Sequence, residues 1–190
     1  MVGARNASAA AVKLARDFSQ GLAEAGFTVV SGLARGIDGA AHEGAFPQTI
    51  GVIASGIDIA YPPQHRDLQD RIASEGLLIA EQPPGTEPRG SHFPSRNRII
   101  AGLASGTLVV EAAVKSGSLI TARLAGEAGR EVMAIPGSPP APRSHGCNHP
   151  IPDGPVPVHS PDDAVDLLTG CAGPPRPTLP SPVAASHQPP

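Results

Sequence analysis

The segment from Phe93 to Ala122 holds the residues that are best suited to bind an anion. Arg96 and Arg98 stand where the sequence predicts the start of a helix, and cationic side chains there oppose the helix macrodipole and favour a nearby anion. Further along, a predicted apolar strand at 107–111 leads into Gly117-Ser118, where free N–H groups at a helix start attract phosphate. The pattern predicts an anion site at a strand end. Taken alone, Gly117-Ser118 also fits an ordinary loop with a serine N-cap.

Two further strand ends combine glycine with arginine. Ser31-Gly32-Leu33-Ala34-Arg35-Gly36-Ile37-Asp38 follows the apolar run Phe27–Val30, and Gly3-Ala4-Arg5 has the same form near the start of the chain. In an open α/β sheet, ligands bind outside the carboxyl ends of the strands, so these segments are expected to converge on one pocket. Asp38 is expected to pair with Arg35 or to cap the helix that follows.

Apolar runs alternate with helical stretches along most of the chain. Strands are predicted at 27–31, 50–54, 76–80, 107–111 and 131–135, and helices near 8–25, 36–45, 64–74, 95–104 and 118–128. This alternation predicts an α/β fold, with a mostly parallel sheet and helices on both faces. The first helix is expected to bury a stripe formed by Ala9, Val12, Leu14, Phe18 and Leu22.

Several motifs occur in an order and spacing that resemble one protein family. They are SGLARGID, YPP, EQPPG, FPSRNRIIAG, VVEA, SGSLITAR and AIPGS. On these motifs the chain is similar to the DprA (also called Smf) family of DNA-processing proteins from about Val2 to Leu168. The resemblance implies an extended Rossmann-like fold that binds single-stranded DNA, protects it during natural transformation and helps to load the RecA recombinase onto it. It implies neither an enzymatic activity nor a cofactor.

The resemblance also implies which residues bind the nucleic acid. Phosphates would be held, through bidentate charge-assisted hydrogen bonds, by Arg5, Arg35, Arg96 and Arg98. Lys115 would add a point charge, and Phe93, held before the rigid φ of Pro94, would stack against a base. Backbone amides and hydroxyls would approach the sugar-phosphate chain at Ser31, Gly32, Gly117, Ser118 and Thr121. Asn97 belongs to the same motif and either joins the binding site or fastens the start of its helix.

The chain departs from the family pattern at both ends. Gly3-Ala4-Arg5 closes the first strand in the family, so that strand is predicted to be largely missing, together with the helical domain before it, through a misplaced gene start or a truncation. A sheet without this strand would expose two apolar edges. No winged-helix domain is expected to follow. The expected organisation is one domain at 1–168 and a Pro-rich disordered tail at 169–190.

A homodimer is compatible with the resemblance. The family draws its dimer contact from the region around Val156-Pro157-Val158. Prolines lack the amide donors that an ordered strand uses, so the sequence argues against an intact strand and dimer contact there.

Composition excludes several other classes of protein. A formal net charge of −3 and an aromatic content of 3% do not suit a generic nucleic-acid binder, so any binding face must be a local pocket. No apolar run is long enough to cross a membrane and there are only 2 cysteines, so a cytoplasmic protein is expected. His145, Cys147 and His149 form an H-x-C-x-H string, but no fourth ligand is evident and Pro150 follows directly, so no metal site is predicted.

Two enzyme classes share parts of this pattern. A LOG-like (lysine-decarboxylase-like) nucleoside-monophosphate phosphoribohydrolase resembles the expected fold and would place Glu111 and Arg98 at the scissile bond. Its PGGxGT signature is missing, and SGSLITA stands in its place. A dinucleotide-dependent oxidoreductase needs G-x-G-x-x-G after the first strand and an acidic residue about twenty positions on, and neither is present. The LOG-like hydrolase is therefore the alternative to a DNA-binding protein.

Overall fold

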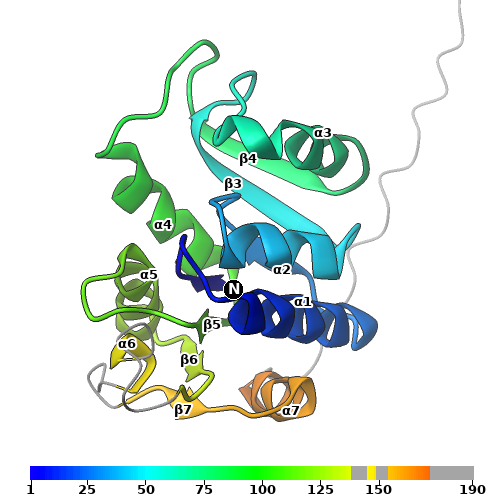
Figure 1. Cartoon of the computed structure of the whole chain (residues 1–190), viewed down its shortest axis with the longest axis vertical. Helices are drawn as coiled ribbons and strands as arrows, with labels where there is room; N and C mark the ends of the chain where they lie inside the picture. Colours follow the sequence, from blue (N-terminus) through cyan, green and yellow to red (C-terminus); the bar gives the residue numbers. More distant parts are fainter. Residues whose placement is uncertain (138–144, 149–153, 172–190) are drawn as a thin grey trace, which may run out of the picture.

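The structure of the chain is a computed structural model, which describes residues 1–137, 145–148 and 154–171 (Figure 1). Its strands are β1 (Val2–Gly3), β2 (Val29–Ser31), β3 (Thr49–Gly56), β4 (Leu77–Gln82), β5 (Gly106–Val110), β6 (Glu131–Ala134) and β7 (Val156–Pro157). Its helices are α1 (Ala9–Glu24), α2 (Ile37–Ala45), η1 (Pro63–His65), α3 (Arg66–Glu75), α4 (His92–Leu103), α5 (Gly117–Glu127), α6 (His145–Asn148) and α7 (Pro161–Cys171).

Every strand pairing among the described residues is parallel. The strands form one sheet in the order β1-β5-β6-β7 and a second in the order β2-β3-β4. β1 lies between the two, because it pairs with Val109 and Val110 of β5 while the Met1 amino group donates a hydrogen bond of 2.7 Å to the Val30 carbonyl of β2. The predicted α/β fold with a mostly parallel sheet is confirmed.

Side chains of β5 show that helices cover both faces. Leu108 and Val110 pack in a cluster with Phe18 of α1, whereas Val109 packs on the opposite face with Ile100 of α4. This alternation follows from the two-residue period of a strand. In Figure 1, α4 and α5 lie on one side of the strands and α1 and α2 on the other. The carboxyl ends of the strands are therefore flanked by helix starts from both layers.

The first strand is present as the short strand β1. Val2 and Gly3 occupy the central position that the sequence predicted to be empty, so the two sheets do not face each other as open edges along their whole length. On the amino-terminal side of β1, an apolar cavity of about 260 Å³ remains between β2 and β5, with Val29 and Leu108 in its lining. The gap between the two sheets is confined to this short stretch, where Val29 and Leu108 are buried.

The prediction that prolines exclude a strand near residue 157 is wrong. β7 pairs with β6, and the Val158 N–H donates a hydrogen bond of 3.0 Å to the Ala134 carbonyl. β7 is the edge strand of its sheet, so it has a neighbouring strand on one side alone. Pro157 is tolerated there although it has no backbone N–H to donate.

Helix α7 was not predicted from the sequence. It runs to Cys171, so the predicted domain boundary after Leu168 falls inside a helix, and residues 172–190 of the predicted tail lie outside the described residues. Within the part of the chain that is described, no helix combines the length and the apolar character needed to cross a membrane.

Two helices differ in detail from the prediction. α1 buries Ala11, Ala15, Phe18, Ser19 and Leu22, whereas the predicted stripe residue Leu14 is 38% exposed. Small alanines face α2, where the two helices pack together, and this shifts the buried stripe. α4 begins at His92 rather than at 95. Pro94 is accepted there because the first turn of a helix has no internal acceptor for its amide.

Candidate nucleic-acid interface

A cavity of about 720 Å³ opens where the carboxyl ends of β1 and β5 meet. The loop after β1 and the starts of α4 and α5 form its walls. The strand order reverses at this point, since β2 lies on one side of β1 and β5 on the other, and open α/β sheets bind ligands at such a switch point. Predicted site residues in its lining are Arg5, Phe93, Arg96, Asn97, Lys115, Gly117, Ser118 and Thr121.

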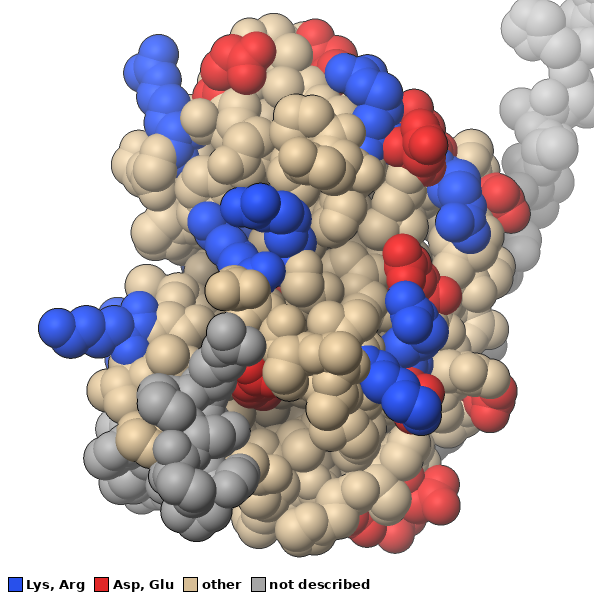
Figure 2. Space-filling model, viewed as in Figure 1, with Lys and Arg blue, Asp and Glu red and all other residues tan. Residues whose placement is uncertain are grey.

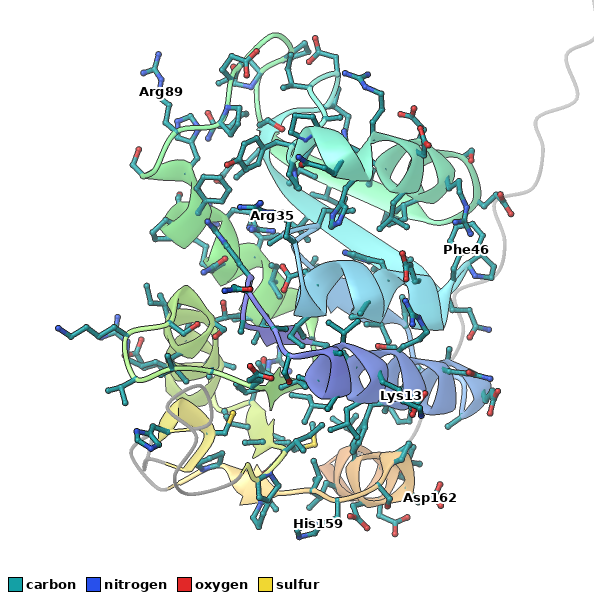
Figure 3. The ribbon with its side chains drawn as sticks, viewed as in Figure 1. Lys13, Arg35, Phe46, Arg89, His159 and Asp162 are labelled. Carbon is teal, nitrogen blue, oxygen red and sulfur yellow. The ribbon has the colours of Figure 1, made fainter. Side chains whose placement is uncertain are left out.

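A second cavity of about 200 Å³ adjoins the first and shares Arg5 and Phe93 with it. The Arg5 guanidinium lies over the Phe93 ring, 4.8 Å from the ring centroid, and the Tyr61 ring packs against Phe93 at 5.6 Å between centroids. Arg5 and Phe93 thus separate the two cavities. Arg35 and Gly32 line the second cavity, and Figure 3 places Arg35 between α2 and α4.

Arg96 lies in the floor of the main cavity rather than at the protein surface. Its side chain is only 5% exposed, and its guanidinium donates a hydrogen bond of 2.5 Å to the Val52 carbonyl. Its Nε is the one buried side-chain polar atom without a hydrogen-bond partner among the described residues. Gly32 is required next to it, because a Cβ at this position would overlap the guanidinium. Arg96 therefore contributes positive charge to the cavity floor.

Asp38 faces Arg96 under the same cavity. Burial raises the pKa of the Asp38 carboxyl, and the positive charge of Arg96 opposes this shift. Burial likewise lowers the pKa of Arg96, with the charge of Asp38 acting in the opposite direction. The expected ion pair between Asp38 and Arg35 is not formed in the described structure, and the Asp38 carboxylate instead accepts a hydrogen bond of 3.4 Å from the Ala34 N–H.

Arg98 and Ser31 lie outside both cavities. Arg98 forms an ion pair with Glu81 of β4. It lies two positions from Arg96 on α4, and residues at this spacing do not share a helix face. Ser31 is fully buried, and its hydroxyl donates a hydrogen bond of 2.7 Å to the Met1 carbonyl. The structure therefore does not bring these two predicted residues together with the others.

The start of α5 faces the main cavity. Ser116, not Ser118, is the N-cap, and its hydroxyl accepts from the Ser118 N–H at 3.4 Å and lies 2.6 Å from the Ser118 hydroxyl. The Asn97 side-chain amide donates to the Gly117 carbonyl at 3.4 Å and so fastens α4 to this helix start. Ser118 and Thr121 are nearly buried in the cavity wall. The positive end of the α5 dipole is thus directed at the cavity.

Glu111 anchors the loop that carries Arg5. Its carboxylate accepts hydrogen bonds from the Ser8 N–H at 3.2 Å and from the Ser8 hydroxyl at 2.5 Å. Arg98 is engaged elsewhere with Glu81, so the two groups that a LOG-like hydrolase would place at a scissile bond do not meet. The residues in these positions form structural contacts instead.

Sequence reasoning missed two histidines that hold the loop before Arg35. The Leu33 N–H donates to Nε2 of His42 at 3.3 Å, and Nδ1 of His65 lies 2.9 Å from the Leu33 carbonyl oxygen. Burial lowers the pKa of His42 to about 3, so its ring is neutral at physiological pH. Single histidines on a helix carry no sequence signal for such contacts, which arise only when α2 and η1 pack around the loop.

Exposed cations gather around the two cavities. Arg5, Arg35 and Lys115 are all exposed. Figure 2 shows basic side chains grouped in the middle of this face, in the place where Figure 3 labels Arg35, with most acidic side chains toward its upper, right and lower edges. The positive surface is local, as the net charge of −3 requires.

Only part of the H-x-C-x-H string lies within the described residues. Cys147 is buried with its Sγ 4.0 Å from the Val109 carbonyl oxygen, and burial raises the pKa of its thiol. His149 lies outside the described residues. Within the described residues, no three side chains of metal-binding type lie close enough together to hold an ion.

Comparison with known proteins identifies related chains. The sequence profile of the family described as DNA recombination-mediator protein A matches residues 1–169. Protein Smf from Synechocystis is 47% identical over 150 residues, which are 77% of this chain and 38% of that protein. The DNA processing protein DprA of Streptococcus pneumoniae is 46% identical over 168 residues, which are 87% of this chain and 59% of that protein. The chain thus spans less than two thirds of the length of either relative.

Solved structures show the same architecture. The X-ray structure of DNA processing protein A from Streptococcus pneumoniae matches with a TM-score of 0.82 at 46% identity, covering 87% of this chain and 59% of that one. DNA processing protein A from Helicobacter pylori, whose structure describes the single-stranded DNA binding mode of that protein, matches with a TM-score of 0.81 at 28% identity. This match covers 89% of this chain and 78% of the Helicobacter pylori chain.

Proposed function

The chain belongs to the DNA recombination-mediator protein A family, also named DprA or Smf, and from this we propose that it binds single-stranded DNA at the carboxyl edge of its sheet. The observation that carries the proposal is the convergence of Arg5, Arg96 and Lys115 with the start of α5 on one cavity. Guanidinium groups and helix N-termini are the groups that hold phosphate most readily. The binding described for the Helicobacter pylori relative supports the same chemistry here.

Single strands suit this site better than duplexes. Phe93 lies between the two cavities and is only half-buried, so an unpaired base can reach its ring, whereas the bases of a duplex are already stacked. Contacts to phosphate and sugar fix the position of the strand but carry no sequence information. The protein is therefore expected to bind single strands with little sequence preference.

The wider role follows from the family. We propose that the bound strand is protected and passed to the RecA recombinase during natural transformation, in the cytoplasm, without catalysis and without a cofactor. The binding residues would be Arg5, Gly32, Arg35, Phe93, Arg96, Asn97, Lys115, Gly117, Ser118 and Thr121, with Arg98 and Ser31 in supporting positions. A homodimer is part of this proposal.

The proposed function is tested by the salt dependence of the affinity and by the preference for single-stranded over duplex DNA. If Arg5, Arg35 and Lys115 each neutralise one phosphate, the log–log slope of affinity against salt should be about −2 for a single strand, at roughly 0.7 per contact. Fluorescence anisotropy with a labelled oligothymidine, and with a duplex of the same length at matched salt, measures both slope and preference. Equal affinity for single-stranded and duplex DNA, or an affinity that does not depend on salt, would contradict the proposed function.

Replacing Phe93 by Leu should weaken single-strand binding by about 1 kcal/mol, at the low end of what one base stack contributes, and leave the salt slope unchanged. Phe46 is a matched control, because its ring also forms a cation–π contact. The Arg71 guanidinium lies 4.2 Å from the centroid of the Phe46 ring. Figure 3 labels Phe46 near the right-hand edge of the molecule, away from the cavity walls around Arg35. Phe46→Leu should leave binding unaffected. Equal losses in the two variants would contradict a stacking role for Phe93.

A further inference from the structure

Leu33 adopts an unusual backbone conformation in the loop between β2 and α2. Its φ is 57°, in the left-handed region that non-glycine residues rarely occupy, and its side chain is fully buried. Such a conformation costs on the order of 1–3 kcal/mol and persists only where surrounding contacts impose it. The Leu33 N–H and carbonyl are both held by hydrogen bonds, to His42 and His65, and its side chain packs in a core cluster.

The direction of each hydrogen bond is fixed by its partners. A carbonyl oxygen only accepts, so Nδ1 of His65 donates to Leu33. The Leu33 N–H donates, so Nε2 of His42 accepts and its Nδ1 carries the proton. The protonated Nδ1 of His42 donates a hydrogen bond of 2.7 Å to the Thr49 hydroxyl, and this hydroxyl donates a hydrogen bond of 2.8 Å to the Val29 carbonyl. His42 is thus held from behind by β3, while His65 approaches the loop from η1.

The hydrogen bond between His65 and the Leu33 carbonyl lies next to two segments that line the second cavity. Arg35 follows Leu33 by two positions and lines one wall. The lining also includes the segment Tyr61–Gln64, which leads directly into His65. The hydrogen bond between His65 and the Leu33 carbonyl therefore links the two segments that contribute Arg35 and Tyr61–Gln64 to the cavity lining.

We propose that His65 is a positioning residue for DNA binding: by holding the Leu33 carbonyl it directs Arg35 toward the phosphate that Arg35 binds. The inference rests on the proposed function, since Arg35 is taken to contact DNA. His65 itself does not line either cavity and would not touch the strand. His42 supports the same peptide from the protein interior.

A matched pair of substitutions isolates the hydrogen bond. Asn and Leu side chains have the same number of heavy atoms and the same branching, but Asn at position 65 retains a donor close to the place of Nδ1 and Leu does not. His65→Leu should weaken binding of a labelled oligothymidine on the order of tenfold, as expected when a charge-assisted contact is misplaced, and should reduce the magnitude of the salt slope by about 0.7. His65→Asn should recover most of the affinity and the wild-type slope.

Combination with Arg35→Ala separates positioning from a general loss of structure. If His65 acts through Arg35, adding His65→Leu to Arg35→Ala should cause little further loss, because the group that it positions is already gone. If His65 merely stabilises the fold, its effect should be the same in both backgrounds. An additive result, or an unchanged affinity of His65→Leu, overturns the inference.

Gly39→Ala provides a second test that leaves His65 and Leu33 in the sequence. A Cβ at Gly39 would lie 2.7 Å from Cε1 of His65 and would displace the imidazole, although alanine favours the helix. It should weaken DNA binding in the wild-type background and have no effect on binding when position 65 is Asn. An effect of Gly39→Ala that persists beside His65→Asn contradicts the proposal.

The failure of this inference can be distinguished from the failure of the proposed function. A wild-type protein that does not bind single strands at low salt contradicts the proposed function itself. Wild-type binding together with additive effects of the His65 and Arg35 variants contradicts only the positioning role of His65.

Discussion

Gly32→Ala is expected to lower the free energy of unfolding by about 3 kcal/mol at neutral pH. The added Cβ overlaps the Arg96 guanidinium, which is almost fully buried and cannot move without giving up its hydrogen bond to the Val52 carbonyl. Overpacking at such a site costs roughly 1–3 kcal/mol, and a buried carbonyl left without a donor costs about 1–3 kcal/mol more. Urea unfolding followed by circular dichroism measures the loss.

The same substitution should change how stability depends on pH. Burial raises the pKa of Asp38, so folding favours its protonated form, and this contribution is present below the unfolded pKa and lost as pH rises through the folded pKa. Arg96 opposes the shift in the wild type. Displacement of its guanidinium removes that opposition and raises the pKa of Asp38 further. The stability deficit of Gly32→Ala should therefore be smaller near pH 4 and grow toward neutral pH.

Two further variants test this explanation. Gly90 also lines the main cavity, but a Cβ there meets no atom within 4 Å, so Gly90→Ala should leave stability nearly unchanged. Replacing Arg96 by Met in the Gly32→Ala background removes the overlap, and the double variant should be less destabilised than the sum of the single effects. Additive losses, or a deficit that does not depend on pH, would show that contact with Arg96 is not the cause.

The elements around the site could be predicted from the sequence because their signals are local. β-branched apolar runs mark β2 and β5, and the glycines that follow them mark the strand ends that the structure brings to one edge. The structure places Arg5, Phe93 and Lys115 at this edge, and strand order and helix starts account for their position. The rules of parallel sheets therefore predict how the backbone is arranged around the site.

The depth and direction of individual side chains could not be predicted in the same way. Arg96 and Arg98 look equivalent in the sequence, yet one is buried beside Asp38 and the other pairs with Glu81 at the protein surface. Which of them faces the sheet depends on how α4 packs against the strands, and α4 also begins at His92, three residues before the predicted start. The contacts of His65 with Leu33 depend on packing between segments far apart in the chain, which no local pattern encodes.

Burial also changes what each arginine can contribute to binding. Arg96 already donates to Val52 and is held by the attraction of Asp38, so it can add charge to the cavity but has little freedom to follow a moving strand. Arg35 is exposed, and none of the ion pairs formed in the described structure involves it. A phosphate that reaches Arg35 therefore gains a full charge-assisted contact without first breaking another. Arg35 is the residue whose loss should affect affinity most.

Arg35→Ala should weaken single-strand binding by about 1.5–3 kcal/mol, the usual range for a hydrogen bond to a charged group, which is about ten- to 150-fold in affinity. The salt slope should lose about 0.7 of its magnitude. Helical content should not change, because the side chain is exposed. Anisotropy titrations at several salt concentrations, with circular dichroism on the same samples, measure all three quantities.

Arg130→Ala is the matched control, because it removes the same charge from the opposite edge of the sheet, between the end of α5 and the start of β6. A long-range electrostatic effect would weaken binding similarly in both variants, since each lowers the net charge by one unit. A direct phosphate contact predicts a loss for Arg35→Ala alone, together with the reduced salt slope. Equal losses would assign the affinity of this protein to its overall field rather than to the cavity, and would contradict the site proposed for Arg35.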